Sequence, residues 1–106
     1  RMQEACAKVR VDRQLVEYAV RLARATRTWP GMAQGGGPRA GIALIRGARA
    51  YALLAGRGFI TPDDIQQVAP AALRHRVVLA PELELDGLRA DEVIQELLTR
   101  VEAPRS

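Results

Sequence analysis

The feature that most constrains the fold is a repeated alternation between segments with helical apolar spacing and short breaks rich in proline and glycine. Over residues 11–31 the apolar side chains recur at helical spacing, and Pro30-Gly31 ends the pattern. The shared face consists of Leu15, Tyr18, Ala19, Leu22 and Ala23. We therefore expect an amphipathic helix here, with Asp12 at its N-cap position.

Two further helices are expected in the middle of the chain. The first begins at or just after Pro38 and ends at Gly56-Arg57-Gly58. Its buried side is expected to consist of Ile42, Ile45, Ala48, Ala52 and Leu53. The second begins after Thr61 as N-cap, with Pro62 as its first residue and Asp64 as the acid of a capping box.

The remaining segments are less regular. Pro70 is expected to kink its helix or to begin a new short helix over residues 70–76, because proline cannot continue the hydrogen-bond ladder. Residues 28–37 are expected to form a loop. Residues 77–85 are expected to be extended or irregular, and a short β pairing near them is compatible with the sequence. A last helix over residues 90–101 would bury Val93, Ile94, Leu97 and Val101.

Composition supports an all-α fold, a small bundle of about four helices. Hydrophobic residues make up 48% of the 106 residues but aromatic residues only 4%, so the core must consist mainly of Ala, Leu, Val and Ile. Ala and Leu lose little on entering a helix. The length fits one domain over residues 1–106, and we read it as part of a longer chain.

Charge and cysteine content limit the classes of function. The net charge is +4, and all but Lys8 of the 16 basic residues are arginine. This reflects either a general preference for arginine or a surface for nucleotides or nucleic acid. Cys6 is the single cysteine, which excludes an internal disulfide, and no metal-ligand cluster surrounds the lone His75. No apolar run approaches the roughly 18 residues of a membrane span and there is no signal peptide, so we expect a cytoplasmic location.

The stretch GGGPRAG, residues 35–41, raises the question of a phosphate-binding loop. Gly36 and Gly41 have the glycine spacing of such a loop, but Lys and Ser/Thr do not follow them and no strand precedes them. The chain therefore has no phosphate loop of its own. What remains is Arg39, a cation in the first turn of a helix whose start is already positive. It is either a solvated surface arginine or an arginine held to meet an external anion.

Other charged residues have local explanations. Acids at expected helix starts are explained by capping and by the helix dipole; they are Asp63, Asp64, Asp91 and Glu92. His75 is interpreted as structural, because no triad spacing includes it. Two arginine pairs are interpreted as solvated faces or as subunit contacts; they are Arg21 with Arg24 and Arg46 with Arg49.

Taken together, the motifs resemble the lid domain of MoxR-type AAA+ ATPases, the group that includes methanol dehydrogenase regulatory proteins. The resemblance extends over nearly the whole chain and is carried by "GGGPRA", the Ala- and Arg-rich segment that follows it, "GRGFITPDDI" and "LRHR". The upstream "VEYAVRLARATRTWP" also resembles the family's helix that ends in Thr-Arg. One departure is Gly37, where the family has Ser before Pro-Arg.

The resemblance implies a function and a site. It implies that Arg39 is the sensor 2 arginine, a catalytic residue that reaches ATP, and that Pro38 and Gly37 lie with it at the nucleotide. ATP and Mg²⁺ would be bound mainly by an α/β core domain that this chain lacks, so the chain alone should not hydrolyse ATP. The implied partners are that core domain, neighbouring subunits in a ring and a von Willebrand factor A-type protein, in a chaperone-like role.

Two alternatives stay open from the sequence. The chain could be a small Arg-rich helical DNA-binding domain, although no helix concentrates Arg with Asn, Gln or Ser on one exposed face as a recognition helix does. Nucleic acid is therefore the less favoured partner. The chain could also be a helical protein-interaction module that only bridges partners.

Overall fold

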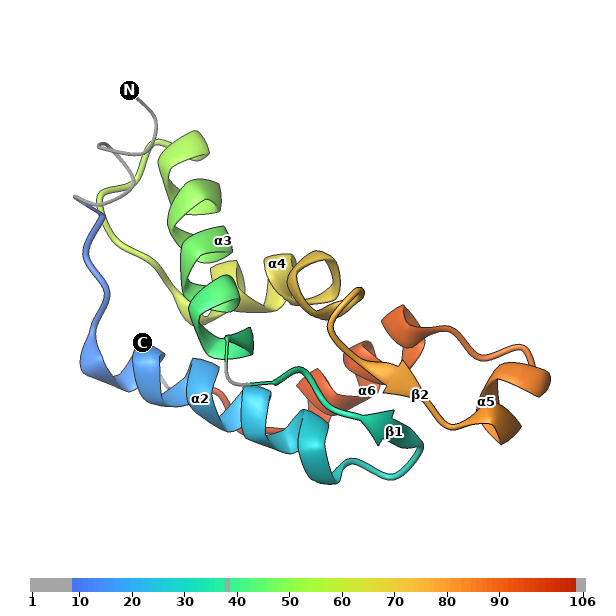
Figure 1. Ribbon diagram of the computed structural model, residues 1–106. Helices are drawn as coiled ribbons and strands as arrows, with labels where there is room; N and C mark the ends of the chain where they lie inside the picture. The colour runs from blue at the N-terminus through green and yellow to red at the C-terminus, as the bar shows by residue number, and fades with distance from the viewer. Residues whose placement is uncertain (1–8, 38, 105–106) are drawn as a thin grey trace.

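The computed structural model describes residues 9–37 and 39–104, and in them it forms five helices and one two-stranded sheet (Figure 1). The elements are α2 (Arg13–Thr28), β1 (Met32–Gln34), α3 (Ala40–Leu54), α4 (Pro62–Leu73), β2 (Val78–Leu79), α5 (Pro81–Leu85) and α6 (Ala90–Arg100). The molecule is elongated, with extents of 43 × 28 × 22 Å. The expected small, mostly helical bundle is confirmed.

Helix α2 buries the face that its sequence predicts. Leu15, Tyr18, Ala19, Leu22 and Ala23 are all buried, and Thr26 continues the face at the C-terminal end. Asp12 occupies the N-cap position, but its side chain makes no capping hydrogen bond. The Asp12 backbone carbonyl instead accepts the first intrahelical bonds. The amphipathic pattern therefore fixes this helix without a side-chain cap.

Helix α3 buries a stripe of mostly small side chains. The buried positions are Ala40, Leu44, Ala48 and Ala52. The expectation for Ile42 is wrong, since its side chain is 52% exposed. Residues four apart share a helix face, and Ile42 lies two residues from that stripe, on another side of the helix. The small stripe lets α4 approach closely, and a Cβ added at Gly47 would lie only 3.2 Å from Val68 Cγ2.

Helix α4 begins with the predicted capping box. Thr61 Oγ1 accepts from the Asp64 N–H, and the Asp64 carboxylate accepts from the Thr61 N–H. Pro70 lies inside this helix, which runs on to Leu73, so the expected new short helix over residues 70–76 is wrong, while the alternative of a kink at Pro70 stays a prediction. The buried face formed by Ile65, Ala69 and Leu73 runs past Pro70, and its packing offsets the missing backbone N–H.

The sheet joins two segments that are distant in sequence. β1 pairs with β2 in antiparallel fashion, with Met32 opposite Leu79 and Gln34 opposite Val78. The expected pairing near residues 77–85 is thus confirmed for β2, while its partner lies in the predicted loop over residues 28–37. An extended or irregular path was expected over residues 77–85. This is wrong for Pro81–Leu85, which form the short helix α5 with Pro81 as its first residue.

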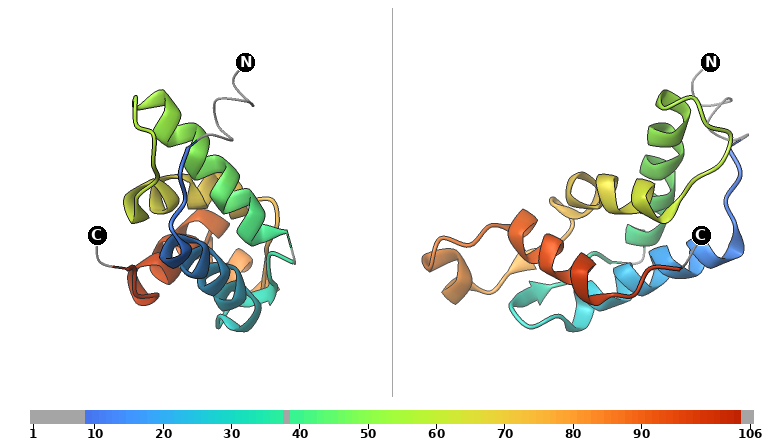
Figure 2. Two further views of the ribbon diagram at one scale, coloured as in Figure 1. Left: turned by 90° about the vertical axis from the view of Figure 1, so that its left-hand side faces the viewer. Right: turned by 180° about the vertical axis from the view of Figure 1, so that it is seen from behind.

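Helix α6 completes the core by packing against α2 and α4, as the view from behind shows (Figure 2). Its buried residues are Val93, Ile94, Leu97 and Leu98. The predicted Val101 follows the helix and is partly buried against the same core. In the part of the chain that is described, no helix is both long and apolar enough to cross a membrane.

Candidate functional site

Arg39 stands at the N-cap position of α3, immediately before the first helical residue. Its side chain is exposed and makes no ion pair with any described residue. The first turn of α3, like that of α2, contains no acidic residue, whereas the first turns of α4, α5 and α6 do. The helix dipole and Arg39 thus place uncompensated positive charge at one point, which suits an external anion.

The glycine loop before Arg39 is anchored to the end of α2. The Gly36 N–H donates a hydrogen bond to Thr26 Oγ1 at 3.0 Å. Thr26 Oγ1 in turn donates to the Ala23 carbonyl at 2.6 Å, and Thr26 is fully buried. A buried hydroxyl therefore holds the backbone of the loop that was expected over residues 28–37. Sequence reasoning missed Thr26, and its only signal was the Thr-Arg pair at the end of the first helix.

Two of the three glycines are required by close packing. A Cβ added at Gly35 would lie 2.7 Å from Arg27 Cα, and one added at Gly36 would lie 2.9 Å from the Cβ of Ala40. Gly37 has φ of +77°, a left-handed conformation that favours glycine over the serine of the family pattern. Pro38, which was predicted to contact nucleotide, lies outside the described residues.

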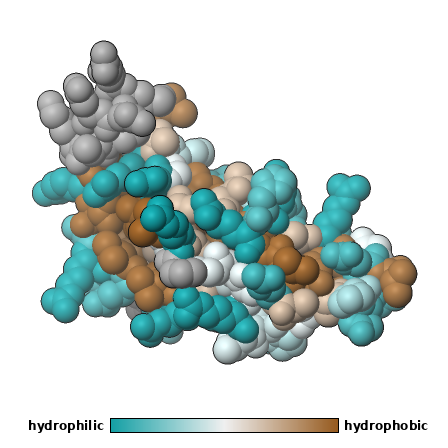
Figure 3. All heavy atoms as spheres, viewed as in Figure 1, coloured by the Kyte–Doolittle hydropathy of each residue, from teal (hydrophilic) through white to brown (hydrophobic). Residues whose placement is uncertain are grey.

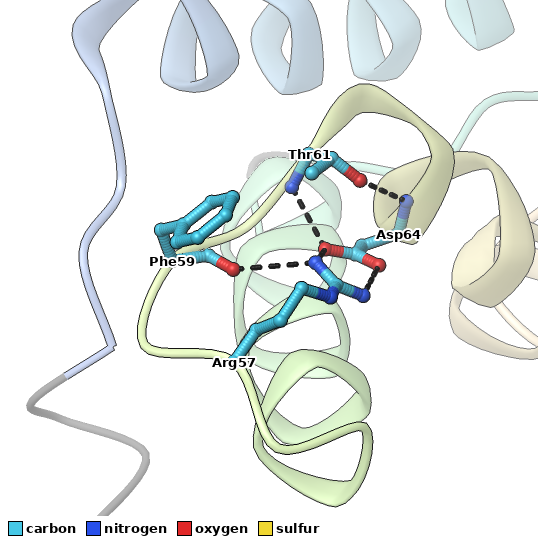
Figure 4. Close-up of polar contacts among 4 residues, drawn as sticks. All are labelled: Arg57, Phe59, Thr61 and Asp64. Atoms are coloured by element: carbon cyan, nitrogen blue, oxygen red, sulfur yellow. Dashed lines mark hydrogen bonds and ion pairs between the residues drawn. The ribbon is translucent and has the colours of Figure 1, made fainter.

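A second polar cluster joins the end of α3 to the start of α4 (Figure 4). Arg57 Nη1 donates to Asp64 Oδ2 at 2.7 Å, and Arg57 Nη2 donates to Asp64 Oδ1 at 2.5 Å. Arg57 also donates to the Phe59 carbonyl at 3.3 Å and lies over the Phe59 ring. The sequence predicted the cap but not the ion pair, whose only signal was the Gly-Arg before the capping box.

This cluster stabilises the fold and has no open position for a ligand. Burial acts to raise the pKa of Asp64, but hydrogen bonds from Arg57 and Thr61 outweigh burial and hold that pKa below its ordinary value. The carboxylate is therefore ionised at neutral pH and fully engaged by its partners. We assign the cluster to the joint between α3 and α4 rather than to chemistry.

No ion pair of the described chain joins Arg39 to the other charged residues singled out in the sequence. Asp91 binds Arg74 through both carboxylate oxygens, at 2.7 Å each, and this pair joins α4 to α6. The neighbouring His75 is exposed. Arg21 lies over the ring of Tyr18, 5.7 Å from its centroid. Among residues 9–37 and 39–104, no three His, Cys, Asp or Glu side chains are grouped to bind a metal ion.

The surface carries several exposed apolar side chains. On the face drawn in Figure 3, apolar patches interrupt a mainly hydrophilic surface. Large hydrophobic residues that remain exposed in the described chain are Val16, Val20, Ile42, Tyr51, Leu54, Phe59, Val78 and Leu85. Leu54 and Leu85 are the most exposed, at 75% and 88%. These side chains come from several elements, α2, α3, β2 and α5 among them.

Comparison with known proteins matches residues 18–97 to the family described as AAA lid domain. The chain is 40% identical to the Bacillus subtilis protein YeaC, covering 97% of this chain and 32% of YeaC. It is 36% identical to Chaperone MoxR1 of Mycobacterium tuberculosis, covering 99% of this chain and 30% of that protein. The crystal structure of a candidate ATPase from Cytophaga hutchinsonii superimposes with a TM-score of 0.89 at 30% identity, covering 96% of this chain and 34% of that one. The chain thus spans about a third of the length of the relatives it matches.

Proposed function

The chain belongs to the AAA lid domain family, of the MoxR type, and we propose that Arg39 is its sensor 2 arginine, a catalytic residue that contacts the phosphates of ATP. The observation that carries the proposal is the position of Arg39. It is an exposed cation at the positive start of α3, with no acid in that first turn. A guanidinium group there can bind two phosphate oxygens at once.

The rest of the nucleotide site would lie on an α/β core domain. In this proposal the core domain binds most of ATP and holds the Mg²⁺ ion that accompanies it. Arg39 would stabilise negative charge on the phosphoryl group as it transfers, and Gly37 with Pro38 would bring the backbone close to the nucleotide.

The exposed apolar side chains support a lid that is covered by partners in the assembled protein. Leu54 and Leu85 are the most exposed of the large hydrophobic side chains that are described, at 75% and 88%. We assign such surface to contacts with the core domain and with neighbouring subunits of a ring. A chaperone-like role in the cytoplasm, with a von Willebrand factor A-type partner, completes the proposal, and the relative named Chaperone MoxR1 supports that role.

The decisive experiment measures ATP turnover by the complete protein that contains this lid. Arg39→Ala should lower kcat by roughly 100-fold, as removal of one fixed charge-stabilising donor does, without lowering the melting temperature. Arg13→Ala, which removes an exposed arginine that pairs only with Glu17 of its own helix α2 among the described residues, is the control and should leave turnover unchanged. Equal turnover in wild type and Arg39→Ala would refute the sensor assignment, and unfolding of Arg39→Ala would make Arg39 structural.

A further inference from the structure

We infer that Thr26 is the positioning residue for Arg39, acting through the glycine loop that joins α2 to α3. The inference rests on the proposed function of Arg39. The side-chain hydroxyl of Thr26 holds the backbone of Gly36, and Gly36 packs against the first residue of α3. The hydroxyl therefore fixes the place from which Arg39 reaches toward a phosphate.

The hydroxyl of Thr26 uses both of its hydrogen-bonding capacities. It donates to the Ala23 carbonyl at 2.6 Å, which sets its orientation. With that orientation fixed, its oxygen accepts from the Gly36 N–H at 3.0 Å. Thr26 is fully buried and Gly36 is also buried, so water cannot replace either bond. Loss of the hydroxyl would leave the Gly36 N–H without its acceptor.

A short path leads from Gly36 to Arg39. The Cβ of Ala40 lies so close to Gly36 that a side chain on Gly36 would approach it to 2.9 Å. The Ala40 N–H also donates to the Gly37 carbonyl at 3.3 Å, and the Ala43 N–H donates to the Arg39 carbonyl at 3.0 Å. A displaced Gly36 would thus shift the start of α3, and Arg39 stands at that start.

Thr99 provides a natural comparison. Its hydroxyl donates to the Glu96 carbonyl at 2.6 Å, with the same spacing along the helix as Thr26 and Ala23. Thr99 is exposed on α6, and its hydroxyl makes no second hydrogen bond to a described residue. The helical bond alone is therefore a local feature shared by both threonines. The bond from Gly36 is what distinguishes Thr26.

The test uses the complete ATPase and compares Thr26→Val, which keeps the shape but removes the hydroxyl, with Thr26→Ser, which keeps the hydroxyl. Thr26→Val should lower kcat by about tenfold, because it shifts Arg39 indirectly. A 1 Å misplacement of a catalytic group can lower the rate by roughly 100-fold. Thr26→Ser should retain turnover near that of wild type. Thr99→Val, the matched control, should leave turnover unchanged. Melting curves establish that each lid is folded at the assay temperature, and Thr26→Ala replaces Thr26→Val if that variant melts too early.

The double variant Thr26→Val with Arg39→Ala separates positioning from general destabilisation. If Thr26 acts through Arg39, adding Thr26→Val to Arg39→Ala causes no further loss of kcat. If Thr26→Val lowers kcat by the same factor in wild type and in Arg39→Ala, the inference is overturned. It is also overturned if Thr26→Val alone turns over ATP at the wild-type rate while Arg39→Ala is impaired. In both cases the function proposed for Arg39 would stand. Wild-type turnover by Arg39→Ala would instead refute the proposed function itself, and the inference with it.

Discussion

Arg57 and Asp64 form a two-point ion pair that joins the end of α3 to the start of α4, with nitrogen–oxygen distances of 2.7 and 2.5 Å. The Asp64 carboxylate also accepts from the Thr61 N–H at 2.7 Å, and it is buried while Arg57 is partly exposed. One carboxylate therefore caps a helix and holds the preceding loop at the same time.

We predict that Asp64→Asn lowers the free energy of unfolding by about 2 kcal/mol, because the buried network loses its negative charge and one acceptor oxygen, and the new NH₂ group faces donors of Arg57 or Thr61. The control is Asp63→Asn, since Asp63 is in the same first turn but is exposed. Its change should stay within about 0.5 kcal/mol. Urea denaturation of each variant measures both values, and equal effects at the two positions would show that the ion pair contributes nothing beyond the helix dipole.

The same pair predicts how stability depends on pH. Hydrogen bonds from Arg57 and Thr61 outweigh burial and place the pKa of Asp64 in the folded chain below its ordinary value. The unfolded chain therefore binds a proton more readily, and the stabilisation is fully present above about pH 5 and is lost as pH falls through about 3.9 toward the lower folded pKa. Urea midpoints measured from about pH 7 to 3 should fall less in Asp64→Asn than in wild type. Parallel curves would contradict the assignment.

Local signals in the sequence were sufficient for the four longer helices, α2, α3, α4 and α6, and for one cap. Thr61 and Asp64 are three residues apart, and the two hydrogen bonds between them depend on little beyond that spacing. The apolar part of the α2 face was likewise predicted, because its apolar residues recur at helical spacing among charged ones, but the buried Thr26 was not.

The errors arise where packing between distant segments decides the outcome. β1 forms because β2 lies beside it, and the sequence of residues 32–34 alone does not indicate that a pairing strand follows at residues 78–79. The face of α3 was misjudged because alanines are numerous on every side of it, so the apolar pattern does not distinguish Ile42 from Leu44. The bond from Gly36 to Thr26 links residues ten positions apart and had no local pattern at all. The role of Arg39 remains a prediction.

The exposed ion pair between Arg74 and Asp91 should contribute less than the buried one. Both side chains are more than 40% exposed, so water and salt screen their attraction despite the good geometry. We predict that Asp91→Asn destabilises the chain less than Asp64→Asn does. The difference between Asp91→Asn and wild type should shrink further in about 1 M salt, where the screening length is only ~3 Å. Thermal melts at low and high salt check this, and an effect that is independent of salt would contradict it.

Gly35 lies so close to α2 that even a methyl group should disturb the loop before Arg39. A Cβ at this position would lie 2.7 and 2.8 Å from the Cα and N of Arg27, and backbone atoms of a helix cannot move aside cheaply. We predict that Gly35→Ala lowers the free energy of unfolding by about 1–3 kcal/mol, the usual effect of overpacking. Gly58→Ala is the control, because no atom lies within 4 Å of its added Cβ, and it should be neutral or stabilising by up to about 1 kcal/mol. Urea denaturation of both variants measures the two changes in unfolding free energy. An unchanged unfolding free energy in Gly35→Ala would contradict the close contact between the loop and α2 that accompanies the hydrogen bond from Gly36 to Thr26.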